Sequence, residues 1–206
     1  MDIFNEGRRS MFSDVMRKYS RAYLEAVARF ISTTGLSPNV VTIIGFLLMI
    51  GVAFVLAWGY FFLGGILITA VGLFDGIDGT MARMMGRTSR FGAFLDSTLD
   101  RFAEAVIFLG LFIYFIGENQ HQELILIYAT VVGSLMVSYA RARAEGIGVY
   151  LKEGLFTRFE RVFLLVVGLL FNQLTIALWI LAIFSNLTAI QRMYLVWRIT
   201  GGEEGG

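Results

Sequence analysis

Residues 75–100 of the chain read DGIDGTMARMMGRTSRFGAFLDSTLD, a stretch that holds four aspartates in two pairs. Asp75 and Asp78 are three residues apart. Asp96 and Asp100 are four residues apart. Residues at either spacing share one face of an α-helix. Because only a short connection separates the two pairs, we expect two antiparallel neighbouring helices whose carboxylates converge on one small volume.

The composition of the chain indicates a membrane protein. Of its 206 residues, 57% are hydrophobic and only 16% are charged, and the mean hydropathy is +0.71. A soluble domain carries about 25% charged residues, so the bilayer is the expected solvent for the long apolar blocks. The net charge of +1 gives no bulk attraction to nucleic acid, and no nucleic-acid partner is expected. The absence of cysteine excludes disulfides and thiolate metal sites.

Six apolar segments are candidates for membrane-spanning helices. They cover Val40–Tyr60, Phe61–Met81, Gly92–Ile116, Glu123–Ala142, Phe159–Phe171 and Leu174–Trp197. The fifth has the shortest purely apolar stretch. We therefore predict an all-α integral membrane protein, with a six-helix transmembrane domain over residues 35–200 and a flexible tail over 201–206.

The region before the first segment has a different pattern. Over Phe12–Ile31 apolar residues recur at helical spacing, and basic residues fall largely between them. This pattern predicts an amphipathic helix at the membrane surface, within an N-terminal cytoplasmic arm over residues 1–34. A helix packed on the rest of the protein is the alternative.

The basic residues predict the topology. All 17 Lys and Arg lie in the N-terminal arm, around the second-to-third and fourth-to-fifth connections, or toward the C-terminus. The other three connections carry none. The positive-inside rule then places both termini and the aspartate site on the cytoplasmic side of the cell membrane.

Four carboxylates at a membrane boundary need a compensating charge. Aspartates near the bilayer are costly, and carboxylates at close range repel one another. Divalent cations resolve both problems, and an all-oxygen ligand set selects hard ions such as Mg²⁺, Mn²⁺ or Ca²⁺. Two ions about 3.5–4 Å apart would suit a phosphoryl displacement. A proton relay or a cation-transport site is the alternative interpretation of intramembrane aspartates.

Other residues around the aspartates add to this chemistry. Four small residues leave the backbone exposed, so that a nucleotide could approach it closely, namely Gly76, Gly79, Ala82 and Gly92. The planar guanidinium of Arg83 is suited to pair with a diphosphate. Glu104 shares the helix face of Asp100, where it could pair with Arg101 or with a neighbouring helix, and it is assigned no site role.

The full spacing resembles the signature of the CDP-alcohol phosphotransferase family, which disfavours the transport interpretation. The chain matches every fixed position of Asp75-x2-Asp78-Gly79-x2-Ala82-Arg83-x8-Gly92-x3-Asp96-x3-Asp100. The six-segment layout, the N-terminal surface helix and the sequence PNVVT at residues 38–42 are also similar to that family. The resemblance therefore covers most of the chain.

This resemblance implies a metal-dependent phosphatidyl transfer. Two Mg²⁺ or Mn²⁺ ions would be held by Asp75, Asp78, Asp96 and Asp100. The CDP site would be lined by Asn39, Thr42, Asp75, Gly79, Ala82, Arg83 and Gly92. With Asp100 as general base, the acceptor oxygen would attack the β-phosphorus of a CDP-lipid, and CMP would leave. The resemblance also implies a homodimer among membrane lipids.

Five arginines bear on the choice of acceptor, namely Arg141, Arg143, Arg158, Arg161 and Arg192. Guanidiniums beside a carboxylate–metal site are best explained by an anionic acceptor, such as a phosphorylated polyol. The alternative is that they obey the positive-inside rule and contact lipid headgroups. Arg192 lies inside an apolar run. For this arginine, the alternative to phosphate binding is that its side chain snorkels to the membrane interface.

Residues 88–93, 138–145 and 159–161 resemble the phosphatidylinositol-phosphate synthase branch of the family. In that branch the acceptor is inositol 1-phosphate, and the donor is CDP-diacylglycerol or its ether-lipid equivalent. The resemblance implies that the inositol phosphate is held by Arg141, Arg143, Arg158 and Arg192. Arg141 stands where a lysine is expected, and the positive charge is kept. Glycerol 3-phosphate, the acceptor of a phosphatidylglycerophosphate synthase, is the alternative.

Overall fold

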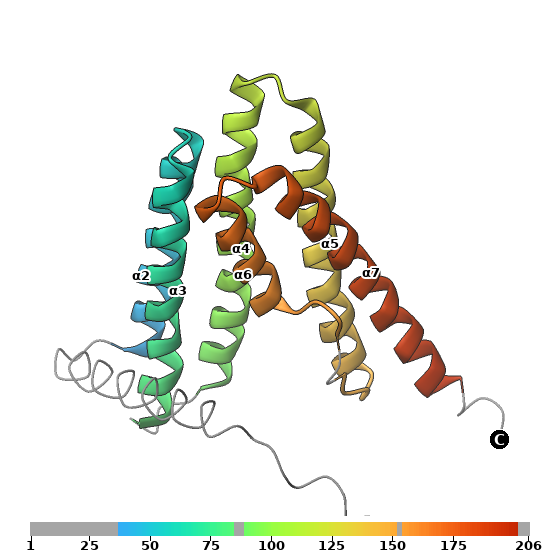
Figure 1. Ribbon diagram of the computed structural model, residues 1–206. Coiled ribbons are helices and arrows are strands. Elements are labelled where there is room, and N and C mark those ends of the chain that lie inside the picture. Colours follow the sequence, from blue (N-terminus) through green and yellow to red (C-terminus); the bar gives the residue numbers. More distant parts are fainter. Residues whose placement is uncertain (1–36, 85–88, 152–153, 202–206) are drawn as a thin grey trace, which may run out of the picture. The chain divides into compact units, whose positions relative to one another are not determined.

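The computed structural model describes residues 37–84, 89–151 and 154–201, and within residues 74–84 it describes the helical backbone alone. These parts form six helices and contain no strand (Figure 1). The helices are α2 (Pro38–Ala57), α3 (Phe61–Met84), α4 (Arg90–Gly117), α5 (His121–Gly146), α6 (Arg158–Leu170) and α7 (Leu174–Thr200). The surface helix predicted over Phe12–Ile31 and the tail after Gly201 lie outside the described residues.

Each predicted apolar segment corresponds to one helix, and the all-α prediction is confirmed for the described residues. Three of the connections are only three residues long, and each contains a residue with left-handed backbone. These residues are Gly59 (φ 82°), Asn119 (φ 55°) and Asn172 (φ 55°). Glycine and asparagine adopt this conformation at the lowest cost. The tight turns are the three connections that carry no basic residue.

The helices differ in how well they suit a bilayer. Among the described helices, α2, α5 and α7 are long and apolar enough to cross a membrane. The apolar part of α3 is shorter, at Phe61–Leu73. Helix α6 has 13 residues and is therefore about 20 Å long, against a hydrocarbon core of about 30 Å. The structure supports a helical integral membrane protein, and the number of six spans stays a prediction.

The described residues fall into two compact units. The smaller unit contains residues 37–45, 72–84 and 89–97, which include three of the four aspartates. The larger unit contains residues 46–71 and the described part of 98–201, with Asp100 and all five arginines that bear on the acceptor.

The core of the larger unit is built from closely packed helices. Helix α7 packs along α5 and against α6. The completely buried core leucines are Leu56, Leu111, Leu178 and Leu181. Gly133 of α5 permits the close approach of α7, because a Cβ at this position would lie 2.7 Å from Asn186 Nδ2. That same nitrogen donates to the carbonyl of Ala129 on α5 at 2.9 Å. This packing holds together the two helices that carry Arg141, Arg143 and Arg192, while Arg158 and Arg161 lie on α6.

Candidate active site

The two aspartate pairs lie on consecutive helices, as their spacing predicts. Asp75 and Asp78 lie in the last part of α3, where only the backbone is described. Asp96 and Asp100 lie four residues apart in the first part of α4. The helical spacing of each pair is confirmed, and the convergence of all four carboxylates stays a prediction. The donor set fits a hard divalent ion, because every proposed ligand atom is a carboxylate oxygen.

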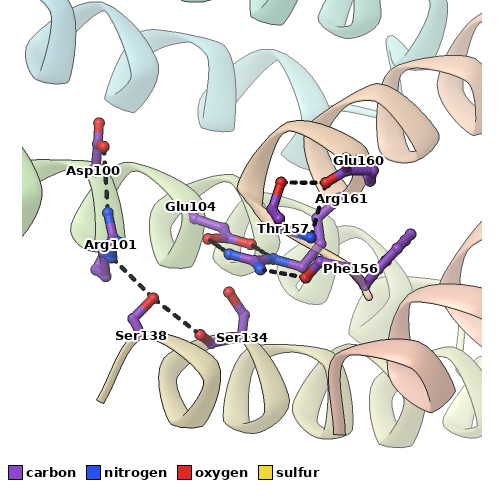
Figure 2. Close-up of polar contacts among 9 residues, drawn as sticks. All are labelled: Asp100, Arg101, Glu104, Ser134, Ser138, Phe156, Thr157, Glu160 and Arg161. Carbon is purple, nitrogen blue, oxygen red and sulfur yellow. Dashed lines mark hydrogen bonds and ion pairs between the residues drawn. The ribbon is translucent and has the colours of Figure 1, made fainter. Parts of the chain in front are cut away.

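Two arginines contact the carboxylate of Asp100. Arg158 Nη1 lies 2.6 Å from Asp100 Oδ2, and Arg101 Nη1 lies 3.3 Å from the same oxygen. Arg101 also donates from Nε to Ser138 Oγ of α5 at 3.0 Å (Figure 2). Only 14% of the Asp100 side-chain surface is exposed. The predicted base is thus held by two guanidiniums, one of which belongs to a predicted acceptor ligand, Arg158.

A second ion pair lies one turn further along the same two helices (Figure 2). Glu104 accepts hydrogen bonds from Arg161 Nε at 2.8 Å and from Arg161 Nη2 at 3.0 Å. The Arg161 side chain is 2% exposed, and its Nη1 donates to the carbonyl of Phe156 at 3.4 Å. Glu104 therefore pairs with a neighbouring helix, one of the two partners that the sequence left open. We call the two pairs the ion-pair ladder: Asp100–Arg158 and Glu104–Arg161.

Arg192 is a buried arginine that has no acidic partner among the side chains that the structure describes. It lies in α7 with 6% of its surface exposed, so its side chain is packed against protein. Its Nη1 donates to the carbonyl of Val137 on α5 at 2.6 Å, and its buried Nε has no hydrogen-bond partner in the described part of the chain. Among the described side chains no carboxylate forms an ion pair with it. A buried guanidinium without a countercharge is unfavourable, so its surroundings favour the arrival of an anion.

Arg141 and Arg143 have a different environment from Arg192. Both are exposed near the end of α5. Arg141 Nε lies 2.8 Å from Glu145 Oε1, in an ion pair between residues four apart on one helix. Exposed pairs of this kind contribute less than about 1 kcal/mol. The role predicted for these two arginines in holding the acceptor stays a prediction.

Two of the residues predicted for the CDP site meet in the smaller unit. A Cβ built on Gly92 would lie 3.0 Å from Asn39 Oδ1 and 3.0 Å from Ser89 Oγ, so a side chain at this position would require these two side chains to shift by a few tenths of an ångström. The Gly92 amide donates to Ser89 Oγ at 2.9 Å. Thr42, one turn after Asn39, is buried and donates from Oγ1 to the carbonyl of Pro38 at 3.1 Å. For Gly79, Ala82 and Arg83 only the helical backbone is described.

Glu104 has no role in the site predicted from sequence, and Arg161 is not among the predicted acceptor ligands, although both belong to the ladder. The spacing of acidic and basic residues along the two helices was a signal that could have indicated this pairing. Two acids four residues apart on α4 face two arginines three residues apart on α6. Such matched spacing places both charges of each helix on one face.

Comparison with known proteins gives consistent results. The sequence model of the CDP-alcohol phosphatidyltransferase family matches residues 35–193. A phosphatidylinositol phosphate synthase of Streptomyces avermitilis is 40% identical over 204 residues, which cover 89% of this chain and 83% of the relative. An archaetidylinositol phosphate synthase of Pyrococcus horikoshii is 37% identical over 173 residues, which cover 83% of this chain and 89% of the relative.

Solved structures agree with these sequence relatives. The Mycobacterium tuberculosis phosphatidylinositol phosphate synthase with CDP-DAG bound superimposes with a TM-score of 0.80 at 33% identity, covering 84% of this chain and 93% of that one. The same enzyme in complex with manganese and citrate gives a TM-score of 0.80 over 84% of this chain and 88% of that one. Since the family model and these relatives cover most of its length, the chain belongs to the CDP-alcohol phosphatidyltransferase family.

Proposed function

We propose that the chain transfers a phosphatidyl group from a CDP-diacylglycerol-type lipid to inositol 1-phosphate. The products are a phosphatidylinositol phosphate and CMP. The observation that carries the choice of acceptor is Arg192, a buried guanidinium without an acidic partner among the described residues. The names of the Streptomyces and Pyrococcus relatives support the same acceptor. A cation or proton transporter finds no support in this family.

The chain's own residues account for the main steps. Asp100 accepts the proton of the acceptor hydroxyl while the acceptor oxygen forms its bond to the β-phosphorus of the donor. The bond between that phosphorus and the oxygen of CMP breaks, and CMP leaves. Arg158 and Arg101 both contact Oδ2 of Asp100 and help to keep its carboxylate in place. A base held in a fixed geometry is effective because little reorganisation is needed during the reaction.

A divalent metal completes the proposed site. Two ions, Mg²⁺ or Mn²⁺, would neutralise the diphosphate of the donor and make CMP a better leaving group. The proposed ligands are Asp75, Asp78, Asp96 and Asp100. Their all-oxygen chemistry fits either ion, and the manganese complex of the M. tuberculosis enzyme supports this choice.

The two substrates are assigned to different residues. The cytidine diphosphate is assigned to Asn39, Thr42, Asp75, Gly79, Ala82, Arg83 and Gly92. The bare backbone at Gly92 beside Asn39 supports this assignment, because a nucleotide can approach there closely. The acceptor phosphate is assigned to Arg141, Arg143, Arg158 and Arg192. The contact of Arg158 with Asp100 supports a position of that phosphate close to the proposed base.

The arrangement in the membrane is part of the proposal. Six spans put both termini and the site on the cytoplasmic side, where a lipid donor and a water-soluble acceptor can meet. We propose a homodimer on the strength of the family resemblance. The donor has either ester-linked or ether-linked chains, as the diacyl and archaetidyl names of the relatives indicate.

Release of CMP by the purified protein tests the function. The assay contains Mg²⁺ and either CDP-diacylglycerol or its ether-lipid analogue, and it compares inositol 1-phosphate, free inositol, glycerol 3-phosphate and serine. We expect CMP release with inositol 1-phosphate alone. Release with glycerol 3-phosphate alone would retain the mechanism and change the acceptor. Release with free inositol or serine would contradict the role given to the arginines, and no release with any acceptor would contradict the proposed activity.

A further inference from the structure

The guanidinium of Arg192 lies against the backbone of Gly154, in the connection between α5 and α6. A Cβ built on Gly154 would lie 2.9 Å from Arg192 Nη2, 3.3 Å from Nε and 3.5 Å from Cζ. Carbon atoms in favourable contact lie about 3.5–4.0 Å apart. The guanidinium therefore occupies space that any side chain at this position would need.

Space, and not backbone conformation, is the reason for a glycine at this position. Of the described glycines, Gly59 and Gly148 have positive φ angles, and Gly154 does not. An L-residue can adopt the backbone of Gly154 without the strain that it would meet at Gly148. The close contact with the Arg192 guanidinium is therefore the feature that requires a glycine at position 154.

The segment that carries Gly154 is fastened on both sides. The Leu155 amide donates to Gln191 Oε1 of α7 at 3.0 Å. The Phe156 carbonyl accepts from Arg161 of the ion-pair ladder. The Thr157 amide donates to Glu160 Oε2 at 2.8 Å, at the start of α6. Because these bonds hold the segment to α6 and α7, the side chain of Arg192 must yield if Gly154 gains a side chain.

On its other side the guanidinium is bound to α5 through the Val137 carbonyl. It is thus held between that carbonyl and the bare backbone of Gly154, and Nε keeps an unused donor. We propose that Gly154 is a positioning residue, whose missing side chain sets where the Arg192 guanidinium lies and hence where the acceptor phosphate binds. This inference rests on the proposed function, which assigns that phosphate to Arg192.

The test compares Gly154→Ala with Gly146→Ala. A Cβ on Gly146 meets nothing within 4 Å, and its φ is not left-handed, so the second variant is a matched control. We expect Gly154→Ala to fold with an unfolding temperature close to that of the wild type, because only the end of a flexible side chain has to move. Its KM for inositol 1-phosphate should rise about tenfold, which corresponds to the loss of about one charge-assisted hydrogen bond. The donor KM and kcat should stay near the wild-type values.

A binding measurement separates this inference from the proposed activity. Inorganic phosphate should raise the unfolding temperature of the wild type and of Gly146→Ala, and Gly154→Ala should need about tenfold more phosphate for the same shift. This readout does not require turnover, so it applies even if the wild type releases no CMP. If the wild type releases no CMP but Gly154→Ala still needs more phosphate than the wild type, the proposed function is wrong and the positioning role of Gly154 is retained.

A double-variant cycle shows whether Gly154 acts through Arg192. In an Arg192→Ala background, Gly154→Ala should have no further effect on phosphate binding, because the group that it displaces is gone. Equal effects in both backgrounds would overturn the proposal. So would an unchanged acceptor KM and phosphate response in a folded Gly154→Ala, or a Gly154→Ala that fails to fold.

Discussion

At Arg192 the chain buries a guanidinium that has one carbonyl acceptor and no acidic partner among the described residues. Arg192→Ala should raise the KM for the phosphorylated acceptor by about 10- to 100-fold, because hydrogen bonds to charged groups contribute about 1.5–3 kcal/mol each. The donor KM should change little. Steady-state CMP release, with each substrate varied in turn, measures both constants.

Arg198 provides the control for that substitution. It is an exposed arginine in the last turn of the same helix, and it has no role in the proposed site. Arg198→Ala should leave both KM values unchanged. If Arg192→Ala raised the donor and acceptor KM values equally, Arg192 would be a structural residue, and the assignment of the phosphate to it would be wrong.

Asp100 is held by two arginines on its carboxylate, so a neutral isostere keeps its shape and removes its basicity. Asp100→Asn should bind the CDP-lipid and lose turnover, with kcat lower by about 10²- to 10⁴-fold, the usual range for a general base. CMP release measures kcat, and direct titration with the CDP-lipid measures binding. Ser97→Ala, at an exposed position one turn earlier on α4, should behave as the wild type. Normal turnover by Asp100→Asn would remove Asp100 from the role of base.

Helices α4 and α6 are joined by the ion-pair ladder, and its two pairs differ in exposure. The Glu104–Arg161 pair is almost completely buried, while Arg158 keeps 35% of its side-chain surface exposed. The buried pair is suited to hold the helices together. The more open pair leaves Arg158 accessible to a substrate. The pair suited to stabilise the fold and the pair with the proposed functional role thus lie on two adjacent turns of the same two helices.

Glu104→Gln tests the structural pair. It leaves the Arg161 charge buried without its carboxylate, and breaking a buried pair in this way costs about 3–5 kcal/mol. We expect a clear fall in the unfolding temperature in detergent or nanodiscs. The same substitution in the exposed Arg141–Glu145 pair, Glu145→Gln, should cost less than about 1 kcal/mol. Equal effects of the two substitutions would show that the buried pair does not stabilise the fold.

The elements of this fold follow from local patterns, and the contacts between them do not. Apolar segments and helical spacing predicted six helices, and the described residues confirm each of them. Helix α6 is shorter than a membrane span, because it begins at the capping box of Thr157 and Glu160 and ends at the tight turn of Asn172. The partner of Glu104 is 57 residues away in the sequence. Spacing along one helix could name the face on which Glu104 lies, but not the helix that meets it.

In the candidate site, too, local spacing could be predicted from the sequence, and contacts between distant residues could not. The aspartate spacing follows from residues 75–100 alone, and the roles of Asn39 and Gly92 came from family resemblance. The position of Asn39 Oδ1, 3.0 Å from where a Cβ of residue 92 would lie, depends on how α2 and α4 begin relative to each other. Gly154 is invisible to sequence reasoning, since a glycine in a connection is ordinary. Its meaning comes only from the guanidinium that α7 brings beside it.

Across the whole molecule, large apolar side chains remain on the surface of the helices. Examples are Phe54, Leu109 and Trp197, which are all more than half exposed. Such surfaces are unfavourable in water and suit contact with lipid. The basic residues lie in the N-terminal arm, around two of the connections and toward the C-terminus, and the three tight turns at Gly59, Asn119 and Asn172 carry none. Together these features predict which connections face the cytoplasm.

The absence of native cysteine makes this topology testable, because any introduced cysteine is the only one in the chain. Gln120→Cys lies in a tight turn, and Gly146→Cys lies at the end of α5, and both positions are exposed. If the positive-inside rule holds, a membrane-impermeant maleimide added to intact cells should label Gln120→Cys, while Gly146→Cys should react only after permeabilisation. CMP release by both variants confirms that the labelled protein is folded. The reverse pattern would put the arginines on the outer face, where a cytoplasmic inositol phosphate could not reach them, and labelling of both positions from outside would contradict a single orientation.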